Sequence, residues 1–140
     1  AAKRLTEAMT GKSIIFGNSI DILLQITPNV VSSRNADKKN LRIREEFDNG
    51  DINLIGSFKK LKQGANLVGL DNCIIHSYYS KSKDLIQRIG RMRNNGEIGR
   101  VFIFVTYGTQ EVKWYNMMFE GLEHLNIIEC DGVEDCITKL

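Results

Sequence analysis

The sequence predicts a three-layer α/β/α domain with a mainly parallel central sheet. Short apolar runs, rich in Ile, Val and Phe, alternate along the chain with longer amphipathic segments. Runs of that composition are typical of strands that a parallel sheet buries on both faces. A regular alternation of strands and helices is the sequence pattern of three-layer α/β folds.

The expected elements follow from this alternation. The strands coincide with the apolar runs, which lie at 13–16, 29–32, 52–55, 73–78, 101–105 and 125–128. The helices coincide with segments whose apolar residues recur three or four positions apart, at 1–11, 38–48, 84–96 and 110–122. A further helix ends near 26, where either Ser19 or Asp21 can cap its start.

Two segments have no clear period. Residues 56–70 contain three glycines and fit neither template, so we expect a long functional loop there. Residues 133–140 are expected to form a short helix or an acidic-flanked tail. The chain as a whole reads as one domain, 1–140, with 124–140 as a possible C-terminal extension.

Composition limits the classes of protein that fit. No apolar run approaches the roughly 20 residues that span a bilayer, so no membrane partner is expected. No signal peptide is expected either. Three cysteines and two histidines lack the spacing of a metal site, so we predict no metal-binding set. Free thiols in a reducing cytoplasm fit this pattern.

Charge is unevenly placed along the chain. Between 57 and 96 there are eight basic residues and only two acids, although the net charge of the whole chain is +2. A locally basic protein of mild overall charge is what an oriented phosphate-binding face requires. The alternative is a chance cluster of surface lysines, because neighbours in sequence need not share a face.

The helix at 84–96 holds the most informative residues. Its apolar positions lie on one stripe, whereas Gln87, Arg88 and Arg91 lie on other faces. A guanidinium group is always charged, and its planar fork matches phosphate oxygens. Gly90 costs the helix roughly 1 kcal/mol relative to Ala, which suggests that a ligand or another backbone approaches closely there.

The run Gln87-Arg-Ile-Gly-Arg91 resembles motif VI of superfamily 2 helicases and translocases, Gln-x-x-Gly-Arg-x-x-Arg. In that family the arginine after the glycine reaches the γ-phosphate of ATP, and Arg91 matches it. Gln87 matches the residue near the nucleotide and the attacking water. The last arginine of the pattern is replaced by Asn94. The resemblance places Arg88 and Gly90 beside the nucleotide.

Other segments carry the resemblance across most of the chain. Residues 12–18 look like motif IV, which ends in Asn18 near the nucleic acid. Residues 57–67 look like motif V, in which Gly64 and Asn66 take the positions near the nucleotide. The resemblance implies that six residues contact the nucleic acid: Asn18, Ser57, Phe58, Lys59, Lys60 and Lys62. The spacing within motif V is similar to that of phage helicases of the UvsW type.

The resemblance implies the second RecA-like half of an ATP-dependent motor. Gly11-Lys12-Ser13 is not the end of a Walker A loop, because the residue five positions before Gly11 is not a glycine. The chain also lacks an Asp-Glu box. ATP with Mg²⁺ is therefore expected to be held mainly by an N-terminal RecA-like half. The chain alone is expected to be inactive. The expected partner is DNA, with RNA possible, in the cytoplasm of a bacterium or a phage-infected cell.

Two other functions fit the residues. One is a degenerate, non-catalytic module of the same fold that binds nucleic acid or protein, which Asn94 and Gln63 favour. The other is an independent small α/β enzyme that uses Arg88 and Arg91 on a phosphorylated metabolite. The sequence shows no nucleophile–base pair for such an enzyme.

Overall fold

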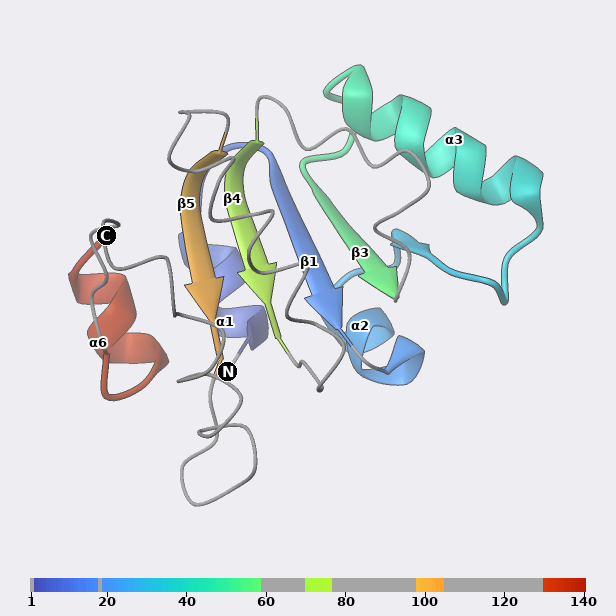
Figure 1. The fold of residues 1–140 in the computed structure, drawn as a ribbon. Coiled ribbons are helices and arrows are strands. Elements are labelled where there is room, and N and C mark those ends of the chain that lie inside the picture. The colour runs from blue at the N-terminus through green and yellow to red at the C-terminus, as the bar shows by residue number, and fades with distance from the viewer. Residues whose placement is uncertain (1, 18, 59–69, 77–97, 105–129) are drawn as a thin grey trace, which may run out of the picture.

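A single parallel sheet organises the molecule (Figure 1). The computed structural model describes residues 2–17, 19–58, 70–76, 98–104 and 130–140. Within these residues the strands lie in the order β2-β3-β1-β4-β5, and each neighbouring pair is parallel. The strands are β1 (Ser13–Gly17), β2 (Val30–Val31), β3 (Leu54–Phe58), β4 (Leu70–Ile75) and β5 (Ile98–Ile103). The predicted α/β class with a parallel sheet is therefore confirmed.

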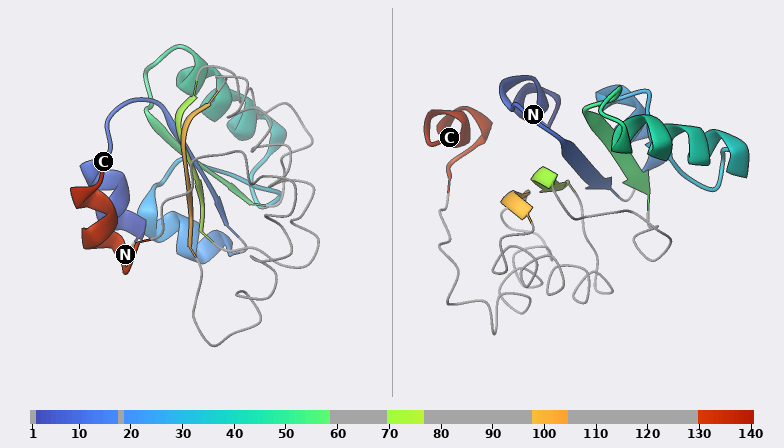
Figure 2. Two further views of the ribbon diagram at one scale, coloured as in Figure 1. Left: turned by 60° about the vertical axis from the view of Figure 1, so that its left-hand side comes forward. Right: turned by 90° about the horizontal axis from the view of Figure 1, so that it is seen from above.

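Helices cover both faces of the sheet (Figure 2). On one face lie α1 (Ala2–Ala8), α2 (Ile20–Ile26) and α6 (Val133–Thr138). On the other lies α3 (Asp37–Asp48), which packs against β2 and β3. The terminal helices α1 and α6 lie side by side, so the first and last described segments meet on the same face.

The core on the first face is apolar. Leu5 of α1, Ile15 of β1, Leu23 of α2 and Ile74 of β4 have no exposed surface. Burying an aliphatic side chain of this size contributes about 1.5–3 kcal/mol. Residues in and just after β5, together with residues of α6, complete this cluster from the side, and they include Phe102, Phe104, Val133, Cys136 and Ile137.

The second face follows from the strand register. Ile14 pairs with both Ile55 and Cys73, so these three buried side chains form one row on the second face of the sheet. Ile43 and Phe47 of α3 are buried four residues apart, as the predicted helix period requires. The core thus has two apolar layers, one on each side of the strands.

The predicted limits of three strands are wrong by two to three residues. β3 spans Leu54–Phe58 rather than 52–55, so the first part of the expected loop at 56–70 is strand. β4 starts at Leu70 rather than 73, and β5 at Ile98 rather than 101. The register pairs Gly56 with Ile15, and it pairs Asn72 with Ser13 and Arg100, so strand pairing overrides the weak strand preference of Gly56 and Asn72.

Other expected elements can be compared directly. The strand β2 is shorter than predicted, α1 and α3 start one residue from the expected positions, and α6 is a helix rather than a tail. The expected helices at 84–96 and 110–122 and the strand at 125–128 lie outside the described residues. Among the helices that are described, none is long and apolar enough to cross a bilayer.

Candidate functional site

The carboxyl edge of the sheet is the candidate site. Because all five strands are parallel, the loops that follow them leave from the same edge, where ligands bind in open α/β sheets. The register aligns Gly17 with Phe58, and Phe16 with both Ser57 and Ile75. The ends of β1, β3 and β4 are therefore level with one another, and the end of β2 joins them where Val31 pairs with Ser57.

Ser57 is the described residue that the motif comparison placed on a nucleic-acid strand. It is the second-last residue of β3, between Phe16 of β1 and Val31 of β2. Only 3% of its surface is exposed. A contact between its hydroxyl group and a phosphate oxygen would therefore require a local rearrangement at the end of β3.

The turn after β1 is fixed by close packing. A Cβ atom on Gly17 would lie 2.9 Å from Cδ2 of Leu23, so a larger residue there would require the buried Leu23 side chain of α2 to shift. Ser19 caps α2, and its hydroxyl oxygen accepts a hydrogen bond of 3.3 Å from the Ile22 amide. Ser19, rather than Asp21, is thus the cap.

A hydrogen-bonded amide network shapes the loop after β2. The side-chain amide of Asn40 donates to the Ser32 carbonyl at 2.8 Å, and its oxygen accepts from the Ser32 amide at 3.3 Å. The Asn35 side chain donates to the same oxygen at 2.9 Å and to the Val30 carbonyl at 2.6 Å. Asn40 is 7% exposed, so this network is largely shielded from water.

The hydrogen-bond network around Asn40 was not predicted from the sequence. The available signal was the position of Asn40, which lies three residues before Ile43 and seven before Phe47 on the buried stripe of α3. A polar side chain on the core face of a helix must find hydrogen-bond partners, because an unpaired buried amide is costly. Its place on the stripe indicates a loop that folds back onto the helix.

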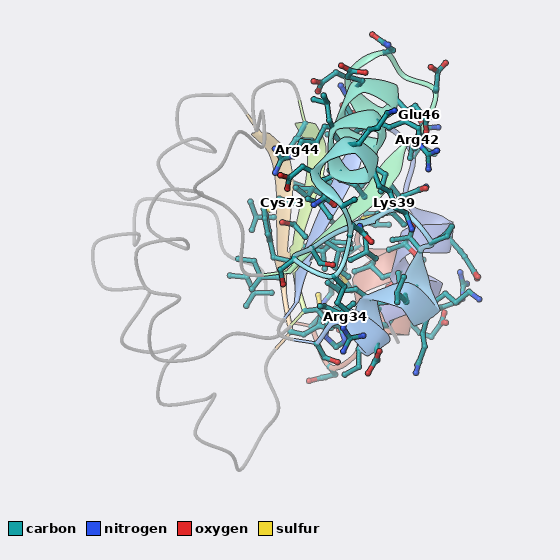
Figure 3. All side chains as sticks on the ribbon, turned by 90° about the vertical axis from the view of Figure 1, so that its right-hand side faces the viewer. Arg34, Lys39, Arg42, Arg44, Glu46 and Cys73 are labelled. Carbon is teal, nitrogen blue, oxygen red and sulfur yellow. The ribbon has the colours of Figure 1, made fainter. Side chains whose placement is uncertain are left out.

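Arg34 connects this loop to α2. Its guanidinium Nη1 lies 2.8 Å from Oδ1 of Asp21, and both side chains are more than half exposed. Figure 3 shows Arg34 close to α2, and Lys39, Arg42 and Arg44 projecting from α3. The described part of the carboxyl edge therefore carries an exposed ion pair beside a fixed loop.

His76 follows β4 at the same edge. Its ring packs edge-on against Phe104, with 5.5 Å between ring centroids. The side chain is half-buried, so its surroundings are those of a packed histidine. Its position just beyond the strand, rather than inside it, differs from the expected strand at 73–78.

Gly11-Lys12-Ser13 lies at the amino edge of the sheet, before β1, whereas a phosphate loop follows a strand. The Lys12 ammonium lies 4.7 Å from the centroid of the Phe47 ring, and its amide donates to the Asp71 carboxylate at 2.7 Å. Ser13 begins β1. These groups lie at the amino ends of the strands, where the residues hold the sheet together.

The described residues include only part of the predicted site. Ser57 lies at the carboxyl edge, and the backbone of Phe58 ends β3 there. The remaining predicted residues lie outside the described ranges: Asn18, Lys59, Lys60, Lys62, Gly64, Asn66, Gln87, Arg88, Gly90 and Arg91. Within those ranges, no three His, Cys, Asp or Glu side chains come together in a group that could hold a metal ion.

Comparisons with known proteins give the family. Residues 1–96 match the model of the helicase conserved C-terminal domain. The chain is 30% identical over 90 residues to the mitochondrial ATP-dependent RNA helicase MRH4 of Eremothecium gossypii. The aligned region covers 59% of the chain and 16% of that protein. It is 30% identical over 63 residues to the protein of the same name from Lodderomyces elongisporus, covering 45% of the chain and 10% of that protein.

Each relative is thus several times longer than the matched part. The family match extends from α1 through the run Gln87–Arg91, so it covers more than half of the chain and both ends of the motif comparison. The parallel sheet with polar residues at its carboxyl edge agrees with that match. The chain belongs to the family of helicase conserved C-terminal domains.

Proposed function

We propose that this chain is the second RecA-like half of an ATP-dependent nucleic-acid helicase or translocase. All 140 residues would form one domain, with 124–140 as its C-terminal extension. ATP would bind between this half and an N-terminal half of the same parent protein, which would hold most of the nucleotide and its Mg²⁺. The observation that carries the proposal is the family match over residues 1–96, which includes Arg91.

In this proposal the residues of the 84–96 segment act on the nucleotide. Arg91 extends its guanidinium group to the γ-phosphate and stabilises the charge that develops during hydrolysis, while Gln87 orients the attacking water. Arg88, Gly90, Gly64 and Asn66 complete the surface that faces the nucleotide. The site is complete only when both halves close, so the chain alone would not hydrolyse ATP.

The nucleic acid would lie along the carboxyl edge of the sheet. Backbone amides and hydroxyl groups position a strand through its phosphates, and lysines add charge that does not depend on sequence. The proposed contacts come from Asn18, Ser57, Phe58, Lys59, Lys60 and Lys62. Support comes from the register, which brings the ends of β1, β2 and β3 level at one edge.

We propose RNA rather than DNA as the substrate. Two relatives that match the chain are named RNA helicases, and no relative named here is a phage enzyme. The likeness to UvsW-type helicases, a DNA substrate and a cytoplasmic site of action remain the alternative prediction. Binding of the parent protein to RNA and DNA strands of equal length and sequence, at equal salt, separates the two substrates.

The decisive experiment for the motor function is Arg91→Ala in the parent protein. We expect nucleic-acid-stimulated ATP turnover to fall by about 10³–10⁵-fold, because the transition-state charge loses its counter-charge. Nucleic-acid binding without nucleotide should be unchanged. Arg42→Ala is the matched control, since Arg42 is an exposed arginine of α3 and should leave turnover unchanged.

The same experiment tests the degenerate-module alternative. If the parent protein binds nucleic acid but shows no ATP turnover that nucleic acid stimulates, the motor proposal is wrong and the binding-module function holds. If turnover is present and Arg91→Ala leaves it intact, Arg91 is removed from the mechanism.

A further inference from the structure

A pair of cysteines at the start of α6 lies outside the proposed motor site. Cys130 precedes the helix by three residues, and Cys136 lies in its first full turn. The Cys130 side chain lies close enough to Cys136 to raise the pKa of the Cys136 thiol. Both residues are half-buried, so water and small solutes reach them. The chain has three cysteines, and the third, Cys73, has no exposed surface.

The local backbone explains why the two thiols meet. Gly132 has a φ angle of 144°, which turns the chain back along the new helix. The Asp131 amide donates to the Asp135 carboxylate at 2.9 Å, and the Cys136 amide donates to the Gly132 carbonyl at 3.0 Å. These bonds hold the residues before α6 against its first turn, so Cys130 stays beside Cys136.

The pair lies where it can affect the terminal helices. Cys136 packs, with Val133 and Ile137, against the core cluster that contains Ala2 and Leu5 of α1. An exposed ion pair of 3.0 Å between Arg4 and Glu134 also joins α1 to α6. A cross-link at the start of α6 would therefore stabilise the contact between the first and last described helices.

We propose that Cys130 and Cys136 form a reversible intramolecular disulfide and are a redox-sensitive modification site of this domain. The oxidant is a small-molecule disulfide such as oxidised glutathione. The Cys130 thiolate attacks one sulfur of the oxidant and expels one glutathione thiolate. The Cys136 thiolate then attacks the Cys130 sulfur and expels the second, so two electrons and two protons pass to two glutathione thiols.

The surroundings assign the order of attack. Burial raises the pKa of the Cys136 thiol, and the neighbouring Cys130 thiol and the Asp135 carboxylate raise it further, while the Lys139 ammonium lowers it. The thiolate is the nucleophile, so Cys136 is a poor first attacker at neutral pH. Its contact with Cys130 suits it to the second, intramolecular step, in which a high effective concentration compensates for a small thiolate fraction.

Mass spectrometry of the full chain in glutathione buffers tests the proposal. Trypsin releases both residues in one peptide, 114–139, and Cys73 in another, 63–81. As the buffer becomes oxidising, peptide 114–139 should lose two hydrogen atoms and resist alkylation. Reduction with dithiothreitol should restore both. Cys73 is an internal control, and in the native protein it should stay reduced and unalkylated throughout.

Two variants separate the disulfide from other oxidations. Cys136→Ser should leave a mixed disulfide with glutathione at Cys130. In Cys130→Ser, the remaining Cys136 thiol should react slowly with oxidised glutathione. The melting temperature of the unsubstituted chain should rise on oxidation by a few degrees, on the order of 5 °C, whereas neither variant should show that rise. The proposal is overturned if peptide 114–139 keeps two alkylatable thiols, or carries two glutathiones, in fully oxidised buffer.

Discussion

The two edges of the sheet hold their polar groups in different ways. At the amino edge, the Asn72 side chain donates to the Thr10 carbonyl and to the Ser13 hydroxyl, both at 3.0 Å, and Asp71 accepts from Lys12. These partners are 59 to 62 residues apart in sequence. At the carboxyl edge, the amide network of Asn40 joins residues that are five to eight positions apart.

The difference separates a structural edge from the candidate functional one. The amino-edge bonds form only after β1 and β4 have paired, so they report and stabilise the assembled sheet. The carboxyl-edge network is local and fixes the shape of one loop. The charged groups beside it, Arg34 and Asp21, remain exposed. An edge with a locally fixed loop and exposed charged side chains is suited to bind a ligand.

The largest effect should come from Gly11→Ala at the amino edge. Gly11 has a φ angle of 93°, and a Cβ atom there would collide with the Asp71 carboxylate that binds the Lys12 amide. We expect the free energy of unfolding to fall by about 3–4 kcal/mol, from backbone strain and from the displaced carboxylate. Urea unfolding measures this change.

Gly50→Ala is the matched control for that change. Gly50 has a similar φ angle of 84°, but nothing lies within 4 Å of a Cβ atom placed there. Its cost should be the backbone strain alone, about 1 kcal/mol. Equal losses in the two variants would show that the Asp71 contact contributes nothing at the amino edge.

A smaller effect is expected from Asn40→Leu at the carboxyl edge. The substitution leaves the Ser32 amide, the Ser32 carbonyl and the Asn35 side chain without their partner. We expect a loss of about 2–3 kcal/mol in the free energy of unfolding. The control is Leu41→Ala, because Leu41 is 55% exposed and its truncation should cost less than about 0.5 kcal/mol. A loss no larger than that of the control would mean that water replaces the network.

The smallest effect is expected from Arg34→Ala. The ion pair with Asp21 joins side chains that are 60% and 74% exposed, so solvent screens it. A double-mutant cycle with Asp21→Ala should give a coupling energy of about 0.2–1 kcal/mol that disappears in 1 M salt. A coupling that survives high salt would show that the charged part of the carboxyl edge is structural after all.

The parallel sheet between helix layers was predictable from the sequence, because strands and helices leave local signals in the order of apolar residues. Ser13–Gly17 is apolar enough to be recognised as a buried strand, and Ile43 and Phe47 show the helix period. The start of β4 was missed because Asp71 and Asn72 look like loop residues. They are acceptable in a strand here because their side chains bind Lys12, Thr10 and Ser13 from distant segments.

The candidate site also has features that the sequence predicts and features that only the strand register shows. Motif spacing pointed to Ser57, but only the strand register shows that β3 continues to Phe58 and that Ser57 is buried between β1 and β2. The Asn40 network was missed because its partners are polar loop residues with no period. The roles of Gln87 and Arg91 remain predictions from the motif.

Residue types at short spacing were enough to predict the alternation of strands and helices, the family motifs and the charge distribution, because each of these is a local property of the chain. Four further features appeared only in the folded structure: the strand order, the strand limits, the hydrogen bonds at the amino edge and the approach of Cys130 to Cys136. Those features depend on which backbone groups and side chains meet in space, and the free energy of such pairing outweighs the local preferences of glycine, aspartate and asparagine.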